Sequence, residues 1–499
     1  MRTFRAALVT TVLILWGAAV LVAEETVAPV DFIGADTATY KLLESNEWDK
    51  LIETGEAALD NGIDYFYLRM RMGIAYYNKG EYINAATQFD EALDFNSGDE
   101  TAMEYLYYSY LFSANTAKVN YLQQRLPQDL RERLNTRPLL LESPGSAGGG
   151  MINEVVPARA GTSWDFKEVA GGRVIEGASG SCRRGATEPR FFDGINTEYG
   201  VTASNNESLN SGIDIDGRAD KYGEFNRADA STYYHAGLMN WLGSDLSLYY
   251  GYTGISINMT KQVRFGNVDT IDKYRIQQTQ IYVSPSWQVG RNTKITPAVN
   301  FINVAYTTIN PAYNTTTSPN VKDKKSTTLN DYVASLALSH DFGRLTCTLF
   351  DTYSELSKSK QSETGVSLLF FPGGDDNTYT NTTVTCMTEQ NADSKTIFDQ
   401  LLGVHLAGAL WAEGDLTVGK LKNFNEKNAY VVYNLGDDIK SKWGISLLLY
   451  PSADINLSLR YTYANKESSY VTYTSATASE THTADYQATS LLGGLQWKF

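Results

Sequence analysis

The sequence predicts a short α-helical array followed by an antiparallel transmembrane β-barrel of about 14 strands. Its 499 residues exceed one ordinary domain, which favours two structural units. Apolar residues recur at helical spacing between residues 37 and 137, and from residue 191 onward the period changes to that of strands. Aromatic residues make up 12% of the chain and Tyr alone occurs 33 times, a composition that suits many strands better than disorder.

Charge and metal-binding residue types narrow the function classes. The formal net charge is −15 at pH 7, and an acidic chain repels phosphate, so we expect no nucleic-acid partner. The three cysteines, Cys182, Cys347 and Cys386, are too scattered for a disulfide framework or a metal motif. The histidines do not stand at metal-ligand spacing from one another: His235, His340, His405 and His482. We therefore expect no metal and no cofactor.

The N-terminus has the pattern of an export signal. Arg2 and Arg5 precede an apolar stretch from Ala6 to Ala23, and Glu24 follows. This order of charged, apolar and small residues predicts a signal peptide over residues 1–23. The alternative is an uncleaved anchor, because the apolar stretch is just long enough to span a bilayer.

The most regular helical pattern lies in residues 67–99. This segment reads YLRMRMGIAYYNKGEYINAATQFDEALDFNSGD and predicts two helices joined at Lys79-Gly80-Glu81. Small and aromatic residues stand at fixed places in it: Gly73, Tyr76, Tyr82, Ala85, Phe89 and Ala92. Their spacing resembles that of the tetratricopeptide repeat, although Ser97 stands where that family commonly has Pro. The small residues are expected to let the helices approach closely, while the rings fill the space between neighbours.

Weaker copies of this pattern flank the segment. Tyr107 and Tyr110 repeat the register of Gly73 and Tyr76. Because a solenoid needs about three repeats to close its core, residues 37–137 predict a minimal array, with an ordinary helical bundle as the alternative. The resemblance implies a concave groove, near Tyr76 and Tyr107, that binds peptides or other proteins.

Residues 138–190 predict a flexible linker. They contain the run Ser-Pro-Gly-Ser-Ala-Gly-Gly-Gly, and Tyr is absent between Tyr121 and Tyr199. Several arginines make the segment basic, which suits a solvated connector or a contact with anionic groups.

Residues 191–499 predict the barrel. Apolar and polar residues alternate strictly from Ile455 to Tyr463, as one apolar and one wet strand face require. Tight turns are predicted at residues 243–245, 290–292, 341–343, 372–375, 413–415 and 451–454. Each turn is entered through or just after an aromatic residue, which predicts a periplasmic girdle at the lipid interface made of Trp241, Trp287, Phe342, Phe371, Trp411 and Tyr450.

The turns also give the strand count. They pair 12 strands, and one strand near residues 191–203 and another over 486–499 raise the total to about 14, with 12 or 16 as alternatives. Polar stretches such as 204–221, 308–326 and 465–481 are predicted to be extracellular loops. Both barrel ends then lie on the periplasmic side, where the helical array also stands.

The last residues resemble the C-terminal signal of bacterial outer-membrane proteins. Phe499 is the terminal aromatic residue, Trp497 stands two places earlier and Gly494 five places earlier, while Leu492 replaces the usual polar residue. The resemblance implies the outer membrane of a Gram-negative bacterium, with membrane lipid and the barrel-assembly machinery as partners.

One histidine is a candidate for a catalytic role. A known class of outer-membrane barrel is a phospholipase that uses Ser, His and Asn, and His405 is predicted to point away from lipid, unlike Val404 and Leu406. The sequence places no nucleophile beside it, so we interpret it as a lumen histidine and expect no catalytic residue and no enzyme.

Two functional hypotheses remain. Chains that combine repeats with a barrel resemble the barrel components of bacterial polysaccharide secretion and the surface lipoprotein assembly modulators, although both groups carry longer repeat domains. The resemblance implies that the repeats recruit a protein or polysaccharide for export or surface assembly. The alternative is a passive porin-like channel or structural barrel whose repeats dock an unidentified periplasmic protein.

Overall fold

A computed structural model describes residues 31–134 except 114, and residues 192–498 except 206–221, 244, 266–267, 312–321, 391, 435–436, 453–454 and 474–478. The predicted signal peptide, the predicted linker and Phe499 lie outside the described residues. Among the helices that are described, none combines the length and the apolar character needed to cross a membrane.

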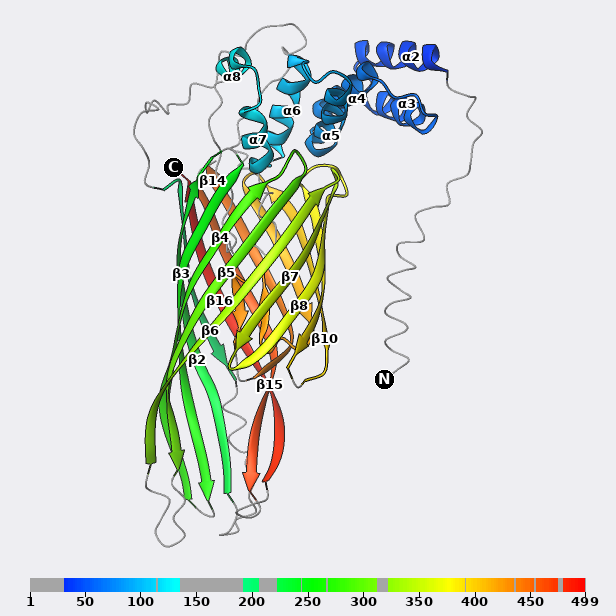
Figure 1. Cartoon of the computed structure of the whole chain (residues 1–499). Helices are drawn as coiled ribbons and strands as arrows, with labels where there is room; N and C mark the ends of the chain where they lie inside the picture. The colour runs from blue at the N-terminus through cyan, green and yellow to red at the C-terminus, as the bar shows by residue number, and fades with distance from the viewer. Residues whose placement is uncertain are drawn as a thin grey trace, which may run out of the picture.

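The N-terminal part is entirely helical within the described residues. Helices α4 and α5 meet at Lys79-Gly80-Glu81, where the sequence predicted a junction, and Gly80 takes the left-handed conformation with φ of 80° that ends a helix. Asp99 caps α6 by accepting a hydrogen bond from the Ala102 amide at 2.8 Å. The helices are α2 (Phe32–Glu44), α3 (Trp48–Asp60), α4 (Phe66–Lys79), α5 (Tyr82–Phe95), α6 (Glu100–Phe112), α7 (Thr116–Gln123) and α8 (Gln128–Leu134). They lie together at one end of the molecule (Figure 1).

The rest of the described chain is a closed antiparallel barrel of 14 strands, which confirms the predicted fold class. Around the ring the order is β1-β16-β15-β14-β11-β10-β9-β8-β7-β6-β5-β4-β3-β2, so β1 and β16 close the sheet. The first strands are β1 (Gly194–Ser204), β2 (Tyr222–Trp241), β3 (Leu246–Phe265), β4 (Val268–Gln288), β5 (Thr293–Pro311), β6 (Lys322–Asp341) and β7 (Leu345–Leu356). They are followed by β8 (Ser359–Phe370), β9 (Thr378–Glu389), β10 (Lys395–Ala407), β11 (Leu410–Val418), β14 (Asp438–Ser452), β15 (Ile455–Tyr473) and β16 (Ser479–Lys498). A separate hairpin consists of β12 (Phe424–Glu426) and β13 (Val431–Tyr433).

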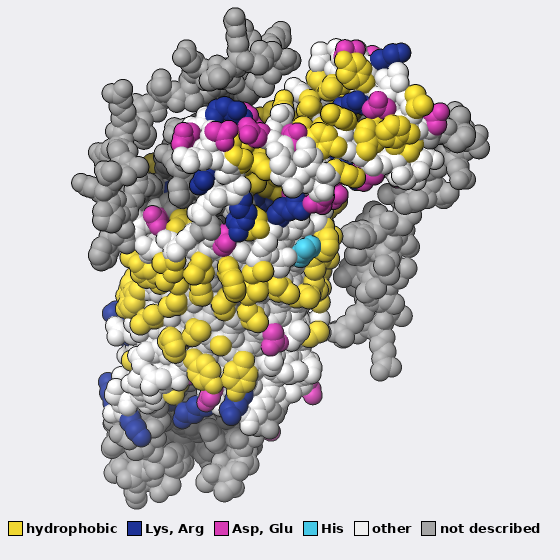
Figure 2. Space-filling view, turned by 45° about the horizontal axis from the view of Figure 1, so that its top comes forward, with side chains coloured by type: hydrophobic (Ala, Val, Ile, Leu, Met, Phe, Trp, Pro, Cys, Tyr) yellow, Lys and Arg dark blue, Asp and Glu magenta, His cyan; other side chains and the backbone are white. Residues whose placement is uncertain are grey.

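Large apolar side chains form a band on the outside of the barrel. Leu449 pairs with Leu457, which also pairs with Leu495, so three strands contribute to one row. These three side chains are about 40% exposed: 41%, 38% and 40% respectively. Figure 2 shows the band as a continuous hydrophobic surface below the helices, with charged side chains gathered between the band and the helices. An outer surface of this kind is what a barrel presents to lipid.

Many strands are longer than a membrane requires. Strands β2 to β6, β15 and β16 have 19–21 residues, whereas about 9–11 residues suffice to cross a bilayer. The predicted loops 308–326 and 465–481 are therefore wrong in extent, because Asn310 pairs with Asp323 and Tyr473 pairs with Ser479. Hydrogen bonding to neighbouring strands continues there although the hydropathy no longer alternates. Figure 1 shows these strands extending past β7 to β10 at the end away from the helices.

One predicted turn is also wrong. Residues 413–415 lie within β11, and the chain reverses five residues earlier at Gly408 and Ala409, where Gly408 has φ of 56°. The sequence predicts a turn at this place because Glu413 and Asp415 flank a glycine, and such residue types favour turns. Both are buried and point into the lumen, where Tyr379 donates to Glu413 at 2.6 Å. Acidic residues on an inward strand face are compatible with a polar lumen.

Candidate functional site

The barrel lumen is lined with polar and charged side chains. Asn300 of β5 and Glu363 of β8 have no exposed surface. Arg460 contacts the Asp415 carboxylate at 2.7 Å, and both side chains are largely buried. Such an interior suits a hydrated passage or a lumen closed by a charge network.

A hairpin formed by residues 419–434 crosses this lumen, and we call it the lumen hairpin. It leaves the wall after β11, forms β12 and β13, and returns to the wall at β14. Its tip contacts β4 and β5 through Asn428 and Ala429. In the ring order β5 stands seven places from β14, and β4 seven places from β11, so the hairpin spans the lumen from one side to the opposite one.

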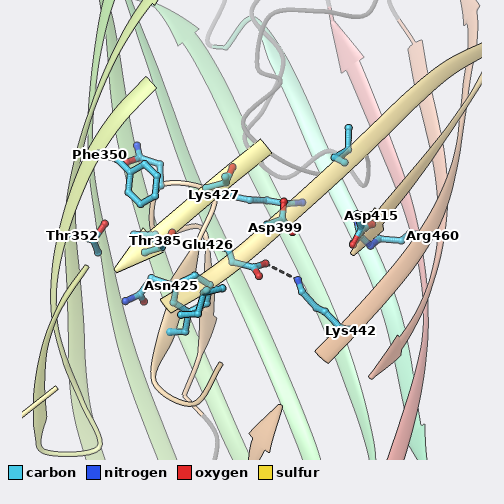
Figure 3. A pocket seen from close by; sticks show the side chains of 16 residues that line it. Phe350, Thr352, Thr385, Asp399, Asp415, Asn425, Glu426, Lys427, Lys442 and Arg460 are labelled. Carbon is cyan, nitrogen blue, oxygen red and sulfur yellow. Dashed lines mark hydrogen bonds and ion pairs between the residues drawn. The ribbon is translucent and has the colours of Figure 1, made fainter. Parts of the chain in front are cut away.

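Buried polar contacts hold the first half of the hairpin. The Lys442 ammonium contacts the Glu426 carboxylate at 2.7 Å and also donates to the Tyr433 hydroxyl at 2.7 Å. Across the lumen, the Glu363 carboxylate accepts from the Asn425 backbone and side-chain amides at 3.0 and 2.9 Å. Figure 3 shows Glu426 and Lys442 facing one another, with Asp415 and Arg460 to one side. Charged groups buried in this way need partners, and the hairpin and wall supply them to one another.

The tip of the lumen hairpin has an unusual backbone. Lys427, Asn428 and Ala429 all have positive φ values, of 53°, 52° and 68°. Non-glycine residues in this region each cost about 1–2 kcal/mol, so tertiary contacts must hold the tip. Tyr282 donates to the Asn428 carbonyl at 3.1 Å and Asn300 donates to the Ala429 carbonyl at 2.9 Å. The Asn428 amide in turn donates to the Thr296 carbonyl at 3.1 Å.

Tyr430, next to the strained tip, is enclosed by wall side chains and is 6% exposed. Its ring centroid lies 5.1 Å from that of His235, 5.3 Å from that of Tyr282 and 6.3 Å from that of Tyr249. Its hydroxyl reaches the Glu198 carboxylate at 3.5 Å. We call this group of wall residues the Tyr430 pocket: Glu198, Tyr233, His235, Tyr249 and Tyr282.

A small cavity lies between the hairpin and the wall. It has a volume of about 60 Å³ and is lined by Asp399, Asp415, Lys427, Lys442 and Arg460, among others. At about 30 Å³ per water molecule, this volume holds roughly two waters. The space between the hairpin and the wall at this place therefore admits only a few water molecules.

The helical domain is docked on the short turns of the barrel. Arg291, between β4 and β5, contacts Asp90 at 2.7 Å and Asp94 at 2.5 Å on α5. Lys118 of α7 contacts Asp341 at 2.7 Å. Three further contacts use the same face: Arg125 with Asp245 at 3.1 Å, Arg344 with Asn84 at 2.5 Å, and the Ile83 amide with the Gly374 carbonyl at 3.1 Å. A cavity of about 290 Å³ lies between α5, α7 and these turns.

The residues singled out for repeat packing lie together in the helical core. Gly73 faces Phe89, and a Cβ atom on Gly73 would stand 2.6 Å from the ring. Burial raises the pKa of Tyr76, as does Glu56, whose carboxylate accepts the Tyr76 hydroxyl at 2.8 Å. Tyr82 is half-buried against Tyr77. The remaining residues are buried, namely Ala85, Phe89, Ala92, Tyr107 and Tyr110. Tyr76 and Tyr107 are therefore core residues and do not line an open groove.

The residues predicted to form an aromatic girdle are divided between two surfaces. Trp287 and Phe342 are on the outside and are 54% and 63% exposed. Phe371, Trp411 and Tyr450 are buried in one inward cluster against which Ile83 of α5 packs. Trp241 packs with the inward Met239 and Tyr249. The prediction of a lipid-facing ring at every turn is wrong for these four, because their side chains lie on the inward strand face, where Ile83 of α5 packs against the cluster of Phe371, Trp411 and Tyr450.

The C-terminal residues and His405 have clear structural neighbours. Trp497 points outward and is 48% exposed, while Gly494 pairs with Glu198 across β1 and β16.

His405 lies at the rim, stacked on Trp411 with centroids 4.2 Å apart, and bonds to Asn377 and to the Gly408 carbonyl. Cys347 and Cys386 are free thiols, and Cys182 lies outside the described residues.

The lumen hairpin was not predicted from the sequence. Its first part reads GKLKNFNEKNAY, rich in Asn and Lys, which resembles a solvated loop in type. The available signal is its length combined with apolar residues. Leu421 and Phe424 recur within a polar connection, and both are buried against the barrel wall.

No protein-family model and no curated protein matches the chain. Among solved structures, the Pseudomonas putida toluene transporter TodX has a TM-score of 0.41 at 6% identity, covering 62% of this chain and 90% of that one. A Pseudomonas aeruginosa FadL homologue has a TM-score of 0.39 at 7% identity, covering 62% and 90%. The translocator domain of autotransporter NalP from Neisseria meningitidis has a TM-score of 0.27 at 7% identity, covering 63% and 90%. Similarity at this level supports no conclusion about function, and the class of this protein, a closed β-barrel with a docked helical domain, follows from its own strand pairing.

Proposed function

We propose that this chain is an outer-membrane barrel with a gated lumen, and that its helical domain receives a protein or polysaccharide for export or surface assembly. The outer apolar band and the polar lumen support the membrane location. The C-terminal residues Gly494, Trp497 and Phe499 support recognition by the barrel-assembly machinery. The helical domain would then be periplasmic, because it is docked on the short turns.

The observation that carries the proposal is the lumen hairpin. It spans the full width of the barrel, and polar side chains of both the hairpin and the wall hold it there. The polar contacts can be exchanged for water, while movement of the hairpin also separates Leu421, Phe424 and Tyr430 from the wall clusters in which they are buried. In the structure the hairpin closes the lumen. The structure therefore favours a gate over a permanently open pore.

The position of the helical domain supports recruitment. It covers part of the barrel mouth, so a cargo bound to the helices would lie next to the entrance. Tyr40 and Tyr67 are 50% and 63% exposed on α2 and α4 and provide accessible contact surface. Recruitment of a cargo by these repeats stays a proposal, as does the tetratricopeptide character of the helices.

Conductance in planar bilayers tests the proposal. The full chain is compared with a variant in which residues 421–434 are replaced by a short Gly-Ser link between β11 and β14. We expect the full chain to be mostly closed and the variant to give a steady conductance. A steady, solute-independent pore in the full chain would instead support the passive channel, and a variant as silent as the full chain would refute the gate.

A further inference from the structure

Four of the five wall residues of the Tyr430 pocket are held by hydrogen bonds within the wall, while the fifth, Tyr282, donates to the Asn428 carbonyl of the hairpin. His235 bonds through Nδ1 to the Thr253 hydroxyl at 2.7 Å and through Nε2 to the Tyr249 hydroxyl at 2.6 Å. Tyr233 donates to the Glu198 carboxylate at 3.0 Å. These residues belong to β1, β2 and β3, so this part of the pocket keeps its shape when the hairpin leaves.

The hairpin fills this pocket with a phenol. The Tyr430 ring stands edge to face with His235 and Tyr282, at interplanar angles of 67° and 88°. Its hydroxyl points to the Glu198 carboxylate, which has a second oxygen available. The wall therefore presents aromatic surfaces and a buried carboxyl acceptor to one six-membered ring that carries a hydroxyl.

The second oxygen of Glu198 indicates that the site can accept one hydrogen bond more than Tyr430 donates. Glu198 is 5% exposed, and its Oε1 atom has no hydrogen-bond partner among the described residues. A buried carboxylate oxygen without a donor is unfavourable. A ring with two adjacent hydroxyls would supply a donor to each carboxylate oxygen.

We propose that the Tyr430 pocket is a binding site for phenolic rings, with catechols preferred, and that such a ligand opens the lumen by replacing Tyr430. This inference rests on the proposed gate. The ligand and Tyr430 exclude one another, so the ligand binds only the state in which the hairpin has left the wall. Binding to that state alone shifts the population toward it.

The inference predicts a definite order of ligands. Toluene has the ring but cannot donate to Glu198. 4-Methylphenol reproduces the contact that Tyr430 makes, and 4-methylcatechol adds a second donor. A buried polar site discriminates strongly against a ligand that leaves it unpaired.

The test is bilayer conductance of the full chain with each of these three compounds. We expect 4-methylcatechol to raise the open fraction at about tenfold lower concentration than 4-methylphenol, as one additional buried hydrogen bond allows. We expect toluene at the same concentration to have no effect, which also controls for bilayer perturbation. A short peptide with one Tyr, compared with its Phe counterpart, distinguishes a polypeptide source of the phenol from a small molecule.

Two variants make the result decisive. Glu198→Gln should remove the advantage of the catechol over the phenol, and its heat-dependent gel mobility reports whether the barrel is folded. Tyr430→Ala should conduct without any compound. If the hairpin replacement conducts but no phenol opens the full chain, the result supports the lumen hairpin as a gate and refutes the Tyr430 pocket as a binding site for phenols. Equal responses to toluene and 4-methylcatechol would refute it as well.

Discussion

At the residue scale, one glycine determines how closely two helices approach. Gly73 of α4 has no Cβ, and Phe89 of α5 occupies the space where a Cβ would lie. Phe89 has no exposed surface and stacks on Tyr105 with centroids 5.1 Å apart, so the ring has little freedom to shift. The sequence predicted this role from spacing alone, because the distance along the chain between a small residue and the ring that packs on it can be recognised without a structure.

We predict that Gly73→Ala destabilises the helical domain. Overpacking costs about 1–3 kcal/mol, whereas Ala gains about 1 kcal/mol in helix propensity, so the net loss is about 2 kcal/mol at most. Gly55→Ala is the matched control, because its Cβ would meet the flexible side chain of Met72. Thermal unfolding followed by circular dichroism at helical wavelengths compares the two full-length variants. A Gly73→Ala protein that melts no lower than Gly55→Ala would contradict this account.

The acidic residues of β11 illustrate where residue types mislead. Glu413 and Asp415 have the composition of a turn, yet they extend into a lumen where Tyr379 and Arg460 meet them. Those partners come from β9 and β15, far away in the sequence. A residue type that favours turns in water is equally stable on a strand when its partner stands across a lumen, and only the closed barrel brings them together.

At the element scale, the connection between β7 and β8 is a strained two-residue turn. Ser357 and Lys358 have φ values of 52° and 68°, which is the mirror-image turn that Asn and Gly favour. The Ser357 amide donates to Asp331 at 3.0 Å, so Ser357 is anchored, while the Lys358 side chain is exposed.

We predict that Lys358→Gly stabilises the barrel by about 1 kcal/mol, because Gly adopts positive φ without a steric penalty. Lys360→Gly is the control, two residues along and also exposed but in ordinary strand conformation, and it should destabilise. The temperature at which the barrel loses its compact gel mobility measures both effects. The same sign for both variants would be inconsistent with relief of backbone strain at residue 358.

At the scale of the whole molecule, charge pairs join the helical domain to the barrel. Arg291 pairs with both Asp90 and Asp94. Lys118 pairs with Asp341, and Arg125 pairs with Asp245. The side chains of Arg291 and Arg125 are partly exposed, so salt screens their pairs and each contributes modestly, whereas the pair of Lys118 with Asp341 is largely buried and is screened less. Their arrangement fixes where the helices sit on the mouth.

We predict that Arg291→Glu loosens this docking, because it places a third acidic group beside Asp90 and Asp94. Hydrogen exchange at α5 and at residues 289–292 should accelerate by about fivefold or more, and adding Asp90→Lys and Asp94→Lys should restore protection. Arg131→Glu, on the exposed surface of α8, serves as the control. Unchanged exchange in the Arg291 variant would show that the apolar cluster around Ile83 holds the domain alone.

The sequence alone predicted a helical domain, the strand alternation and a barrel of about 14 strands, because each depends on the spacing of neighbours along one chain. Tertiary structure decided what fills the lumen. The contacts of Tyr430 with Glu198, His235 and Tyr282 join residues about 150–230 positions apart. The left-handed tip has one local bond, from the Tyr430 amide to the Lys427 carbonyl, and is otherwise held by bonds to the opposite wall. Local propensity favours neither the buried position of Tyr430 nor the left-handed tip. The free energy that stabilises both comes from wall residues that come close only when the barrel closes.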